Sequence, residues 1–144
     1  MSQLRIEGEA AATRAAVGIA VEAASGFARR CGLTRLYRYR LCVVVEELVS
    51  NVIDHGRPAP DSVITFTFEA VPEAVRISLG DAGAPFDPRE PLGPRTEGEG
   101  GWGWPIIMAW CRVAAYRRAD GRNRLELTMP ADFDAPGVGS AGDL

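Results

Sequence analysis

The spacing of apolar residues in the first third of the chain predicts two helices. Residues 9 to 31 are rich in Ala, and apolar side chains recur there at helical spacing until Gly32, a common helix stop. From Arg35 to His55 a second run places apolar residues at the i, i+3, i+4 and i+7 positions, and Gly56 follows it. We therefore expect two consecutive amphipathic helices.

After these helices the period changes from helical to alternating. Apolar and polar residues alternate over residues 64–69 and 75–79, which predicts two strands joined by a turn near Pro72. Residues 113–117 and 124–129 are expected to form a last hairpin, because two alternating runs flank an Asp-Gly pair. The second half of the chain should therefore supply most of a sheet.

A glycine- and proline-rich segment separates the two pairs of strands. It runs from Gly80 to about Gly103, and a short apolar helix that ends at Cys111 follows it. This order predicts an α/β (α+β) sandwich with a mixed, largely antiparallel sheet and helices on one face. One domain should span residues 1–130, and residues 131–144, which contain few large apolar side chains, should form a flexible tail.

Composition narrows the class of protein. A chain of 144 residues can bury a real core without disulfides or a structural metal. The three cysteines lie in apolar runs without metal-ligand spacing, so we interpret them as reduced core thiols. The sequence shows no signal-peptide pattern, and no apolar run reaches the roughly 18 residues that a spanning helix needs. We expect a cytoplasmic protein that does not contact a membrane.

The charge balance argues against a nucleic-acid partner. The net charge of −3 provides no basic field that would attract a polyanion. All 16 basic residues are Arg, so a P-loop, which needs a phosphate-binding Lys, is excluded. Several arginines gather in the two predicted helices, and we expect them to meet an acidic protein surface or to pair locally rather than to bind nucleic acid.

Two polar residues of the second helix stand at the edge of its apolar stripe. With Leu48 at the centre of the stripe and about 100° per residue, Asn51 falls at about −60° and Glu47 at about −100°. Because they are i, i+4 neighbours, both side chains can reach one bound group. An amide oxygen suits Mg²⁺, and a carboxylate beside it can accept a proton from an attacking hydroxyl. From the helix alone, an ordinary pair of polar residues at the helix border explains these two positions equally well.

The single histidine lies in the last turn of the same helix. His55 falls at about −20°, inside the apolar stripe. We therefore interpret it as a packed or carbonyl-bonded residue rather than as a catalytic one.

A carboxylate follows the strand that ends at Leu79. Asp81 stands two residues before Gly83. It can accept a hydrogen bond from an exocyclic amine such as that of adenine, while Gly83 lets a flat ring approach the backbone. A turn capped by the Asp side chain is the simpler alternative.

The segment GEGGWGWP exposes several backbone amides just before a predicted helix. Gly98, Gly100, Gly101 and Gly103 carry no side chain that would cover those amides. Such an arrangement suits a cradle for phosphates, although a plain loop would have the same composition.

Together the three elements resemble the GHKL family of ATPases, which includes gyrase, heat-shock chaperones, histidine kinases and mismatch-repair ATPases. The family's motifs match in order and spacing: E-x-x-x-N at residues 47–51, D-x-G-x at 81–84 and the second glycine motif at 98–103. The resemblance covers about residues 35–130. It implies the Bergerat ATP-binding fold of this family, with ATP and Mg²⁺ as cofactors.

Carried over by position, the resemblance implies a role for each matching residue. Glu47 would be the general base, Asn51 the Mg²⁺ ligand and Asp81 the adenine contact, with the glycines at the phosphates. Asp54 matches an acidic position of the gyrase-like and chaperone-like members, which implies a water-mediated contact. A salt bridge on the helix surface is equally compatible with Asp54.

Two departures from the family pattern bear on turnover. Pro85 lies in the nucleotide-binding segment where many relatives have Gly, and Trp102 and Trp104 add bulk to the glycine loop. These side chains either pack over the nucleotide or distort the cradle. ATP binding is therefore the firmer expectation, and catalytic turnover the weaker one.

Within the family, the chain looks like the bacterial anti-sigma-factor serine/threonine kinases. We expect neither a phospho-acceptor His on a dimerisation helix nor further transducing domains. The resemblance implies a protein that binds Mg-ATP, sequesters a sigma factor and phosphorylates an antagonist protein on Ser or Thr, usually as a homodimer. The alternative is a non-catalytic ATP-binding regulatory module that acts only by partner binding. Glu47 favours the kinase, because a pure binder has no use for a base.

Overall fold

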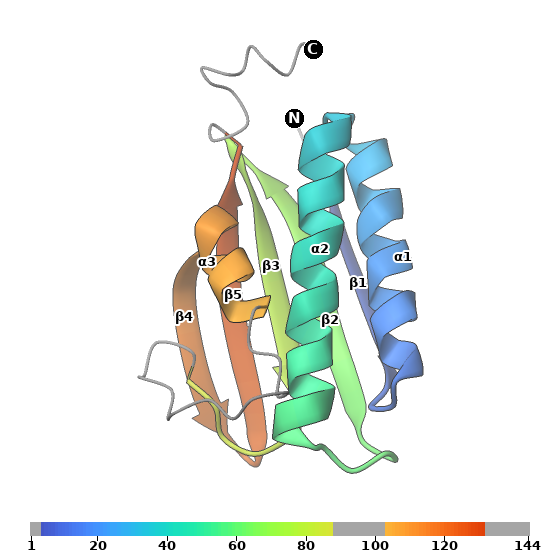
Figure 1. The fold of residues 1–144 in the computed structure, drawn as a ribbon, viewed down its shortest axis with the longest axis vertical. Helices are drawn as coiled ribbons and strands as arrows, with labels where there is room; N and C mark the ends of the chain where they lie inside the picture. Colours follow the sequence, from blue (N-terminus) through green and yellow to red (C-terminus); the bar gives the residue numbers. More distant parts are fainter. Residues whose placement is uncertain (1–3, 88–102, 132–144) are drawn as a thin grey trace.

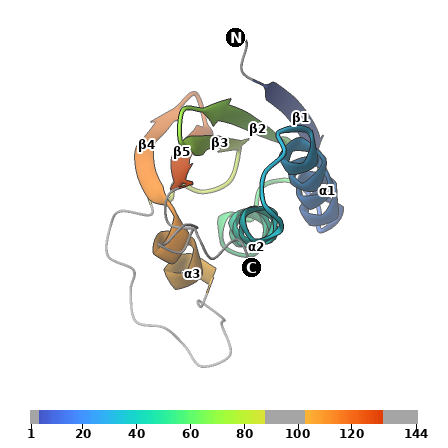
Figure 2. The same ribbon diagram turned by 90° about the horizontal axis from the view of Figure 1, so that it is seen from above.

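A computed structural model describes residues 4–87 and 103–131. Its elements are, in order, β1 (Arg5–Ala11), α1 (Ala15–Arg30), α2 (Arg35–Asn51), the π-helical turn η1 (Val52–Gly56), β2 (Val63–Val71), β3 (Ala74–Asp81), α3 (Gly103–Trp110), β4 (Arg112–Ala119) and β5 (Arg122–Pro130). A five-stranded sheet in the order β1-β2-β3-β5-β4 carries the helices on one face (Figures 1 and 2), which confirms the predicted sandwich. Every pairing among these strands is antiparallel, where a mixed, largely antiparallel sheet was expected.

The first helix begins later than predicted, because the chain opens with the edge strand β1. This strand pairs with β2, and its inward positions are Ile6, Gly8 and Ala10. Gly8 leaves room for Phe66, since a Cβ on Gly8 would lie 2.5 Å from a ring carbon of that side chain. Because the inward residues are small, the sequence shows no clear apolar–polar alternation, and its Ala-rich composition favours a helix. Pairing with β2 overrides that local preference.

The core lies between the sheet and the two long helices. Phe27 of α1 and Phe68 of β2 are fully buried, with ring centroids 5.9 Å apart. Thr34 caps α2 by accepting a hydrogen bond of 3.0 Å from the backbone amide of Tyr37. The hydroxyl of Tyr37 in turn donates to the carbonyl of Met129 in β5. The start of α2 is therefore fixed against the far end of the sheet.

The short helix α3 packs beside α2. Ile107 of α3 is fully buried, and the guanidinium of Arg40 in α2 lies 5.2 Å from the ring centroid of Trp110. Such a cation–π contact joins the two helices at their exposed edge. None of the helices in the described part of the chain is long and apolar enough to cross a lipid bilayer.

Both predicted hairpins are confirmed. The turn between β2 and β3 contains Glu73 with φ of 64°, directly after Pro72. The turn between β4 and β5 places Asp120 at φ 53° and Gly121 at φ 76°, the left-handed pair that a tight two-residue hairpin turn requires. The second hairpin contributes Tyr116, Asn123 and Leu125 to the lining of the pocket described below.

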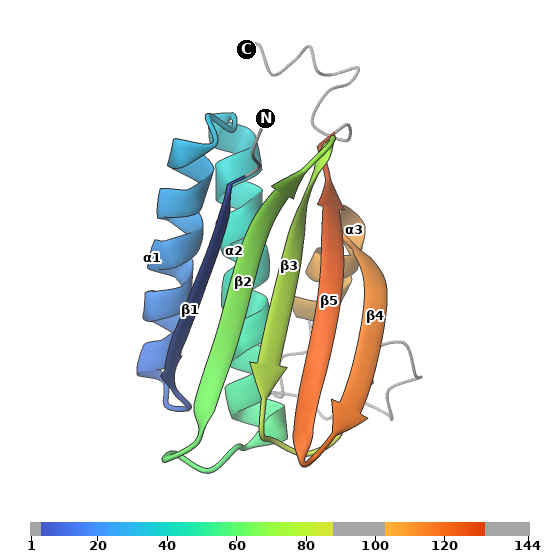
Figure 3. The same ribbon diagram turned by 180° about the vertical axis from the view of Figure 1, so that it is seen from behind.

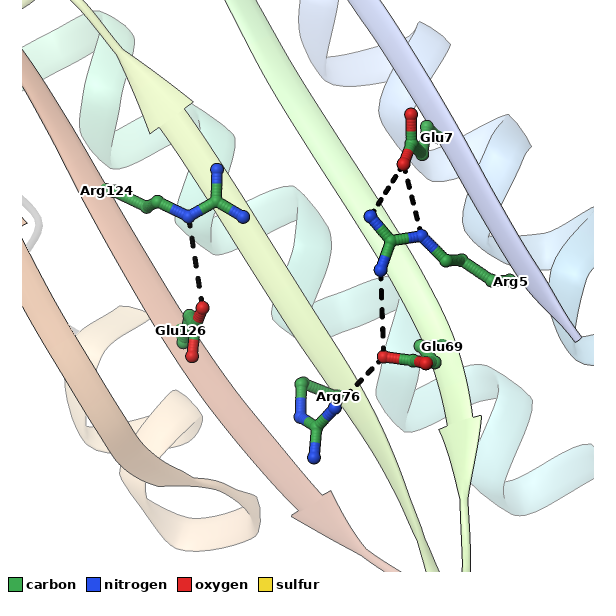
Figure 4. A network of polar contacts seen from close by, with 6 residues as sticks. All are labelled: Arg5, Glu7, Glu69, Arg76, Arg124 and Glu126. Atoms are coloured by element: carbon green, nitrogen blue, oxygen red, sulfur yellow. Dashed lines mark hydrogen bonds and ion pairs between the residues drawn. The ribbon is translucent and has the colours of Figure 1, made fainter. Parts of the chain in front are cut away.

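Figure 3 shows the face of the sheet that the helices leave uncovered. Ion pairs link charged residues across it (Figure 4): Arg5–Glu7 at 2.6 Å, Arg5–Glu69 at 3.9 Å, Arg76–Glu69 at 3.0 Å and Arg124–Glu126 at 3.8 Å. Because these side chains remain partly exposed, the pairs add little to stability. The pocket described below lies on the other face.

The cysteines are free thiols. Cys111 is buried, and burial raises the pKa of its thiol to about 12. Cys31 and Cys42 are half-buried beside the core, and burial raises the pKa of both thiols. The three side chains are therefore poorly reactive, as the apolar runs around them predict.

Candidate functional site

The helical geometry changes where the candidate site begins. After Asn51 the chain continues as the π-helical turn η1 and leaves it at Arg57, which has φ of 47°. Hydrogen bonds in a π-helix run from i to i+5, so each residue turns less about the axis than in an α-helix. His55 nevertheless lines the same pocket as Leu48 and Val52 of the predicted apolar stripe. His55 is exposed and borders the pocket, so its interpretation as a packed residue of the apolar stripe is wrong.

A pocket opens between α2, η1, the C-terminal end of β3, the β4–β5 hairpin and α3. Its open space is about 530 Å³, part of which is continuous with solvent. The lining residues are Leu48, Asn51, Val52, His55, Gly56, Leu79, Asp81, Ala84, Phe86, Trp104, Tyr116, Asn123 and Leu125. Apolar walls with a few convergent polar groups are typical of a small-molecule site. The structure thus brings Asn51 and Asp81, predicted from separate motifs, to one pocket.

The amide of Asn51, at the end of α2, has no hydrogen-bond partner among the described residues. Asn51 is half-buried. No described side-chain oxygen or nitrogen is both fully buried and unpartnered, so this amide is accessible. Because Asn51 lines the pocket, its amide is available to a bound group there.

Glu47 lies one turn before Asn51 on the same helix. It is half-buried, and burial raises the pKa of its carboxyl, with the neighbouring charge of Glu46 acting in the same direction. A glutamate with a raised pKa is a better proton acceptor than an ordinary one. Glu47 is not among the described residues that line the pocket, so it stands beside the site rather than in its wall.

Asp81 is both a turn cap and a pocket residue. It is only 6% exposed, and its Oδ1 accepts hydrogen bonds from the amide of Gly83 at 2.7 Å and from Nδ2 of Asn123 at 3.1 Å. Oδ2 makes no hydrogen bond to a described residue, and it is not a buried unpartnered atom. The two interpretations of the D-x-G motif are therefore compatible, because one oxygen caps the turn and the other is left for a ligand.

Gly83 permits a close approach between two backbone segments. The amide of Ala84 donates to the carbonyl of Gly56 at 2.9 Å, and a Cβ on Gly83 would lie 2.7 Å from that same carbonyl oxygen. A side chain there would separate the loop after β3 from η1. The contact with Gly56, rather than room for a flat ring, is the reason for glycine that the described residues provide.

No motif in the sequence marks the residues that hold the loop after β3. Asn123 is 6% exposed, and its Nδ2 also donates to the carbonyls of Ala84 at 2.9 Å and Gly83 at 3.4 Å. Its Oδ1 accepts from the hydroxyl of Tyr116 at 2.5 Å and from Nη1 of Arg118 at 3.1 Å. The alternation of β5 contains the signal, since the inward series that ends in Leu and Met begins with this Asn. A polar residue at an inward position needs partners.

Asp54 and Pro85 lie outside the pocket wall. Asp54 is exposed and forms an ion pair with Arg14, the surface pairing that was one of its two predicted roles. Pro85 is exposed in the loop after β3 and is not among the described lining residues. Neither residue reaches the pocket directly in this arrangement.

The glycine motif is only partly described. Gly103 is the first residue of α3, whereas Gly98, Gly100, Gly101 and Trp102 lie outside the described residues. Trp104, in the first turn of α3, lines the pocket and meets Phe86 edge to face, with ring centroids 6.4 Å apart. One of the two bulky departures from the family pattern thus packs at the pocket edge.

These groups fit a purine nucleotide. The apolar walls suit a flat ring, the free oxygen of Asp81 can accept from an amine, and the free amide of Asn51 offers a hard oxygen to Mg²⁺. No cluster of three or more His, Cys, Asp or Glu occurs among residues 4–87 and 103–131. Mg²⁺ suits such a site, because it usually takes one or two protein ligands together with phosphates. Fold and pocket together define a nucleotide-binding α+β domain.

Comparison with known families identifies the class more closely. The chain matches the model of the histidine kinase-like ATPase domain over residues 10–129. It belongs to that family, and ATP binding follows from the membership.

Two relatives illustrate the range of the family. The chain is 28% identical over 98 residues to the serine/threonine-protein kinase BtrW of Bordetella bronchiseptica, an alignment that covers 63% of this chain and 69% of the relative. The structure of the RsbU and RsbW domains of Rv1364c from Mycobacterium tuberculosis matches with a TM-score of 0.61 and 17% identity over 88% of this chain. This chain spans only 32% of that longer chain, and at 17% identity the likeness concerns the fold alone.

Proposed function

We propose that this domain is an ATP-dependent protein serine/threonine kinase that also sequesters a sigma factor. The observation that carries the proposal is the placement of an unpartnered Asn51 and a free Asp81 oxygen in one apolar pocket, with Glu47 one helical turn away. Similarity to BtrW, which is described as a serine/threonine-protein kinase, supports the reaction. The phosphorylated partner would be an antagonist protein that carries a Ser or Thr acceptor.

In this proposal each pocket residue has a defined task. Oδ2 of Asp81 accepts a hydrogen bond from the exocyclic amine of adenine, and the walls formed by Leu48, Leu79 and Leu125 enclose the base. Asn51 holds Mg²⁺ through its amide oxygen. When bound, Mg²⁺ neutralises charge on the phosphate oxygens.

Phosphate transfer requires one proton acceptor. The carboxylate of Glu47 takes the proton of the acceptor hydroxyl while the hydroxyl oxygen attacks the γ-phosphorus of ATP. The bond between the γ-phosphorus and the β–γ bridging oxygen breaks, and ADP leaves with the bonding electrons. The phosphoryl group ends on the Ser or Thr of the antagonist, and the proton ends on Glu47.

Sigma-factor capture rests on the motif resemblance and on unpaired charge. Arg29, Arg30 and Arg35 are exposed and make no ion pair with a described carboxylate. Arg57, by contrast, bonds locally, because its Nε donates to the carbonyl of Asp54 at 3.5 Å. The unpaired arginines support binding to an acidic protein surface. A homodimer remains a prediction from the resemblance.

One observation favours the second candidate, a regulatory module that binds ATP and acts only by holding its partner. Glu47 is not among the described residues that line the pocket. A module of this kind would retain Asp81 and Asn51 for nucleotide binding and would show no transfer. The two candidates therefore differ in chemistry and not in affinity.

The deciding experiment measures transfer from labelled ATP to the antagonist protein with Glu47→Gln. This variant keeps size and hydrogen bonding but cannot accept the proton, so transfer should fall roughly 10²-fold or more. ATP affinity and sigma-factor capture should stay within a few-fold of wild type, since a base acts only in the transition state.

The matched control is Glu46→Gln, which removes the same charge from the exposed neighbouring residue. Its transfer rate at neutral pH should equal that of wild type. Unchanged transfer in Glu47→Gln would remove Glu47 as the base. A folded wild-type protein that binds ATP but shows no transfer would favour the regulatory module.

A further inference from the structure

The pocket contains a buried amide whose hydrogen-bonding capacity is fully used within the protein. Nδ2 of Asn123 donates to Oδ1 of Asp81 at 3.1 Å and to the carbonyl of Ala84 at 2.9 Å. Its Oδ1 accepts from Tyr116 at 2.5 Å and from Arg118 at 3.1 Å. A primary amide has two donor hydrogens and two acceptor lone pairs, so none is left over for a ligand. Asn123 therefore acts on a bound base only through its neighbours.

The sheet register holds this amide in one place. Arg118 of β4, Asn123 of β5 and Asp81 of β3 are successive register partners, so they form one row across three strands. From the same row, Nη1 of Arg118 donates to the carbonyl of Gly83 at 2.6 Å. The hydroxyl of Tyr116 accepts from the amide of Phe86 at 3.1 Å. The hairpin thus holds both the carboxylate and the loop that follows it.

This network decides which oxygen of Asp81 faces the pocket. Two donors, the amide of Gly83 at 2.7 Å and Nδ2 of Asn123 at 3.1 Å, converge on Oδ1. A carboxylate held at one oxygen by two fixed donors presents the other oxygen in a single direction. Without Asn123 a single donor would remain, and the carboxylate could rotate.

We propose that Asn123 is the positioning residue that sets base specificity, with Tyr116 holding it in turn. Asn123 fixes the direction of Oδ2, and the pocket thereby recognises a base with an amine rather than a carbonyl at its 6-position. The inference rests on the proposed nucleotide site. It adds a specificity determinant from the last hairpin, a part of the chain in which no motif predicts a site residue.

The test compares the affinities of Mg-ATP and Mg-ITP, because inosine carries a carbonyl where adenine carries the amine. In wild type ATP should bind more tightly than ITP. In Asn123→Ala the affinity for ATP should fall by about tenfold while the affinity for ITP changes little, since one hydrogen bond to a charged group is lost. A general loss of structure would lower both affinities equally.

Two further variants keep the test decisive. Tyr116→Phe retains the ring but loses the hydroxyl that holds Asn123, so the ATP-to-ITP ratio should fall less than in Asn123→Ala. If Asn123→Ala does not fold, the ATP-to-ITP ratio of Tyr116→Phe tests the positioning role instead. Arg124→Gln is the control, because Arg124 lies on the same strand but on the open face, 3.8 Å from Glu126 (Figure 4), and its ratio should match wild type.

The outcomes separate this inference from the proposed function. If folded wild type does not bind ATP, the proposed function fails and the inference fails with it. If wild type discriminates between ATP and ITP but Asn123→Ala and Tyr116→Phe discriminate equally well, only the positioning role is wrong. Equal losses for both nucleotides would also overturn it.

Discussion

The two ends of the pocket are built in different ways. At the end proposed for the base, here the base end, Asp81 and Asn123 are buried and bonded to each other and to the loop after β3. At the helix end, Asn51 and Glu47 are half-buried and make no hydrogen bond to another described residue. The base end is therefore preorganised by hydrogen bonds within the protein, whereas the helix end offers polar groups that are free to bind a ligand.

This difference indicates how binding is divided. A preorganised acceptor discriminates between bases, because its direction is fixed at no further entropic cost when the ligand binds. Free groups on a helix can adapt to a metal and to a phosphoryl group that moves during transfer. We therefore expect changes at the base end to alter selectivity, and changes at the helix end to alter metal-dependent affinity and rate.

The largest change in the folded protein should come from Gly83→Ala, which breaks the base end. The new Cβ would lie 2.7 Å from the carbonyl oxygen of Gly56, a backbone atom that cannot rotate away. Overpacking of this kind costs roughly 1–3 kcal/mol of unfolding free energy, measurable by urea denaturation, and ATP binding should weaken with it.

A matched control for this substitution is available in α1. A Cβ on Gly18 would meet nothing within 4 Å, so Gly18→Ala should stabilise the protein by up to about 1 kcal/mol. If both substitutions had the same effect, the contact between Gly83 and Gly56 would have no energetic role.

At the helix end, Asn51→Ala should weaken Mg-ATP binding by at least about tenfold, or about 1.4 kcal/mol. The alanine offers no oxygen to the metal, and the free amide makes no structural hydrogen bond to a described residue that would be lost with it. Calorimetry with and without Mg²⁺ gives the measurement. Affinity that falls equally in the absence of metal would contradict the assignment of Asn51 as its ligand.

Asp81→Asn sharpens the comparison by exchanging one group without adding volume. The amide of Gly83 and Nδ2 of Asn123 both donate to the Oδ1 position, so they select the carbonyl oxygen of the new Asn. Its NH₂ group then takes the place of Oδ2 and opposes the adenine amine, donor against donor. The ratio of ATP to GTP affinity should fall by several-fold, about 1 kcal/mol. An unchanged ratio would mean that Asp81 only caps the turn.

The fold was largely predictable because its signals are local. The alternation of β2 to β5, the helical rhythm of α2 and the Asp120-Gly121 turn each appear in a short window of sequence. The strand β1 could not be predicted, because small residues, Gly8 and Ala10, stand at its inward positions. Large apolar side chains there would have produced a visible alternation. What identifies it is its pairing with β2, a contact between segments about sixty residues apart.

The placement of two motif residues in one pocket was predictable from the sequence. Asn51 and Asp81 were assigned to one site by separate motifs, and the fold brings them to one pocket. Asn123 has no motif, and its role depends on strand register, which sequence periodicity alone does not provide. His55 was wrongly predicted to be packed, because at this level the apolar stripe borders the pocket, where His55 is exposed.

The smallest expected effect concerns pH at the helix end. Burial raises the pKa of Glu47, and the charge of Glu46 raises it further. A group whose pKa is raised in the folded state favours folding while it is protonated, below its unfolded pKa, and this contribution is lost as pH rises through the folded value.

Transfer has the opposite dependence, because the base must be charged. The acid limb of the rate profile should therefore lie above the ordinary glutamate pKa of about 4.3. Glu46→Gln removes one cause of the shift and should move that limb slightly to lower pH, without altering transfer at neutral pH. A limb that does not respond to Glu46→Gln would show that another group governs the acid side of the reaction.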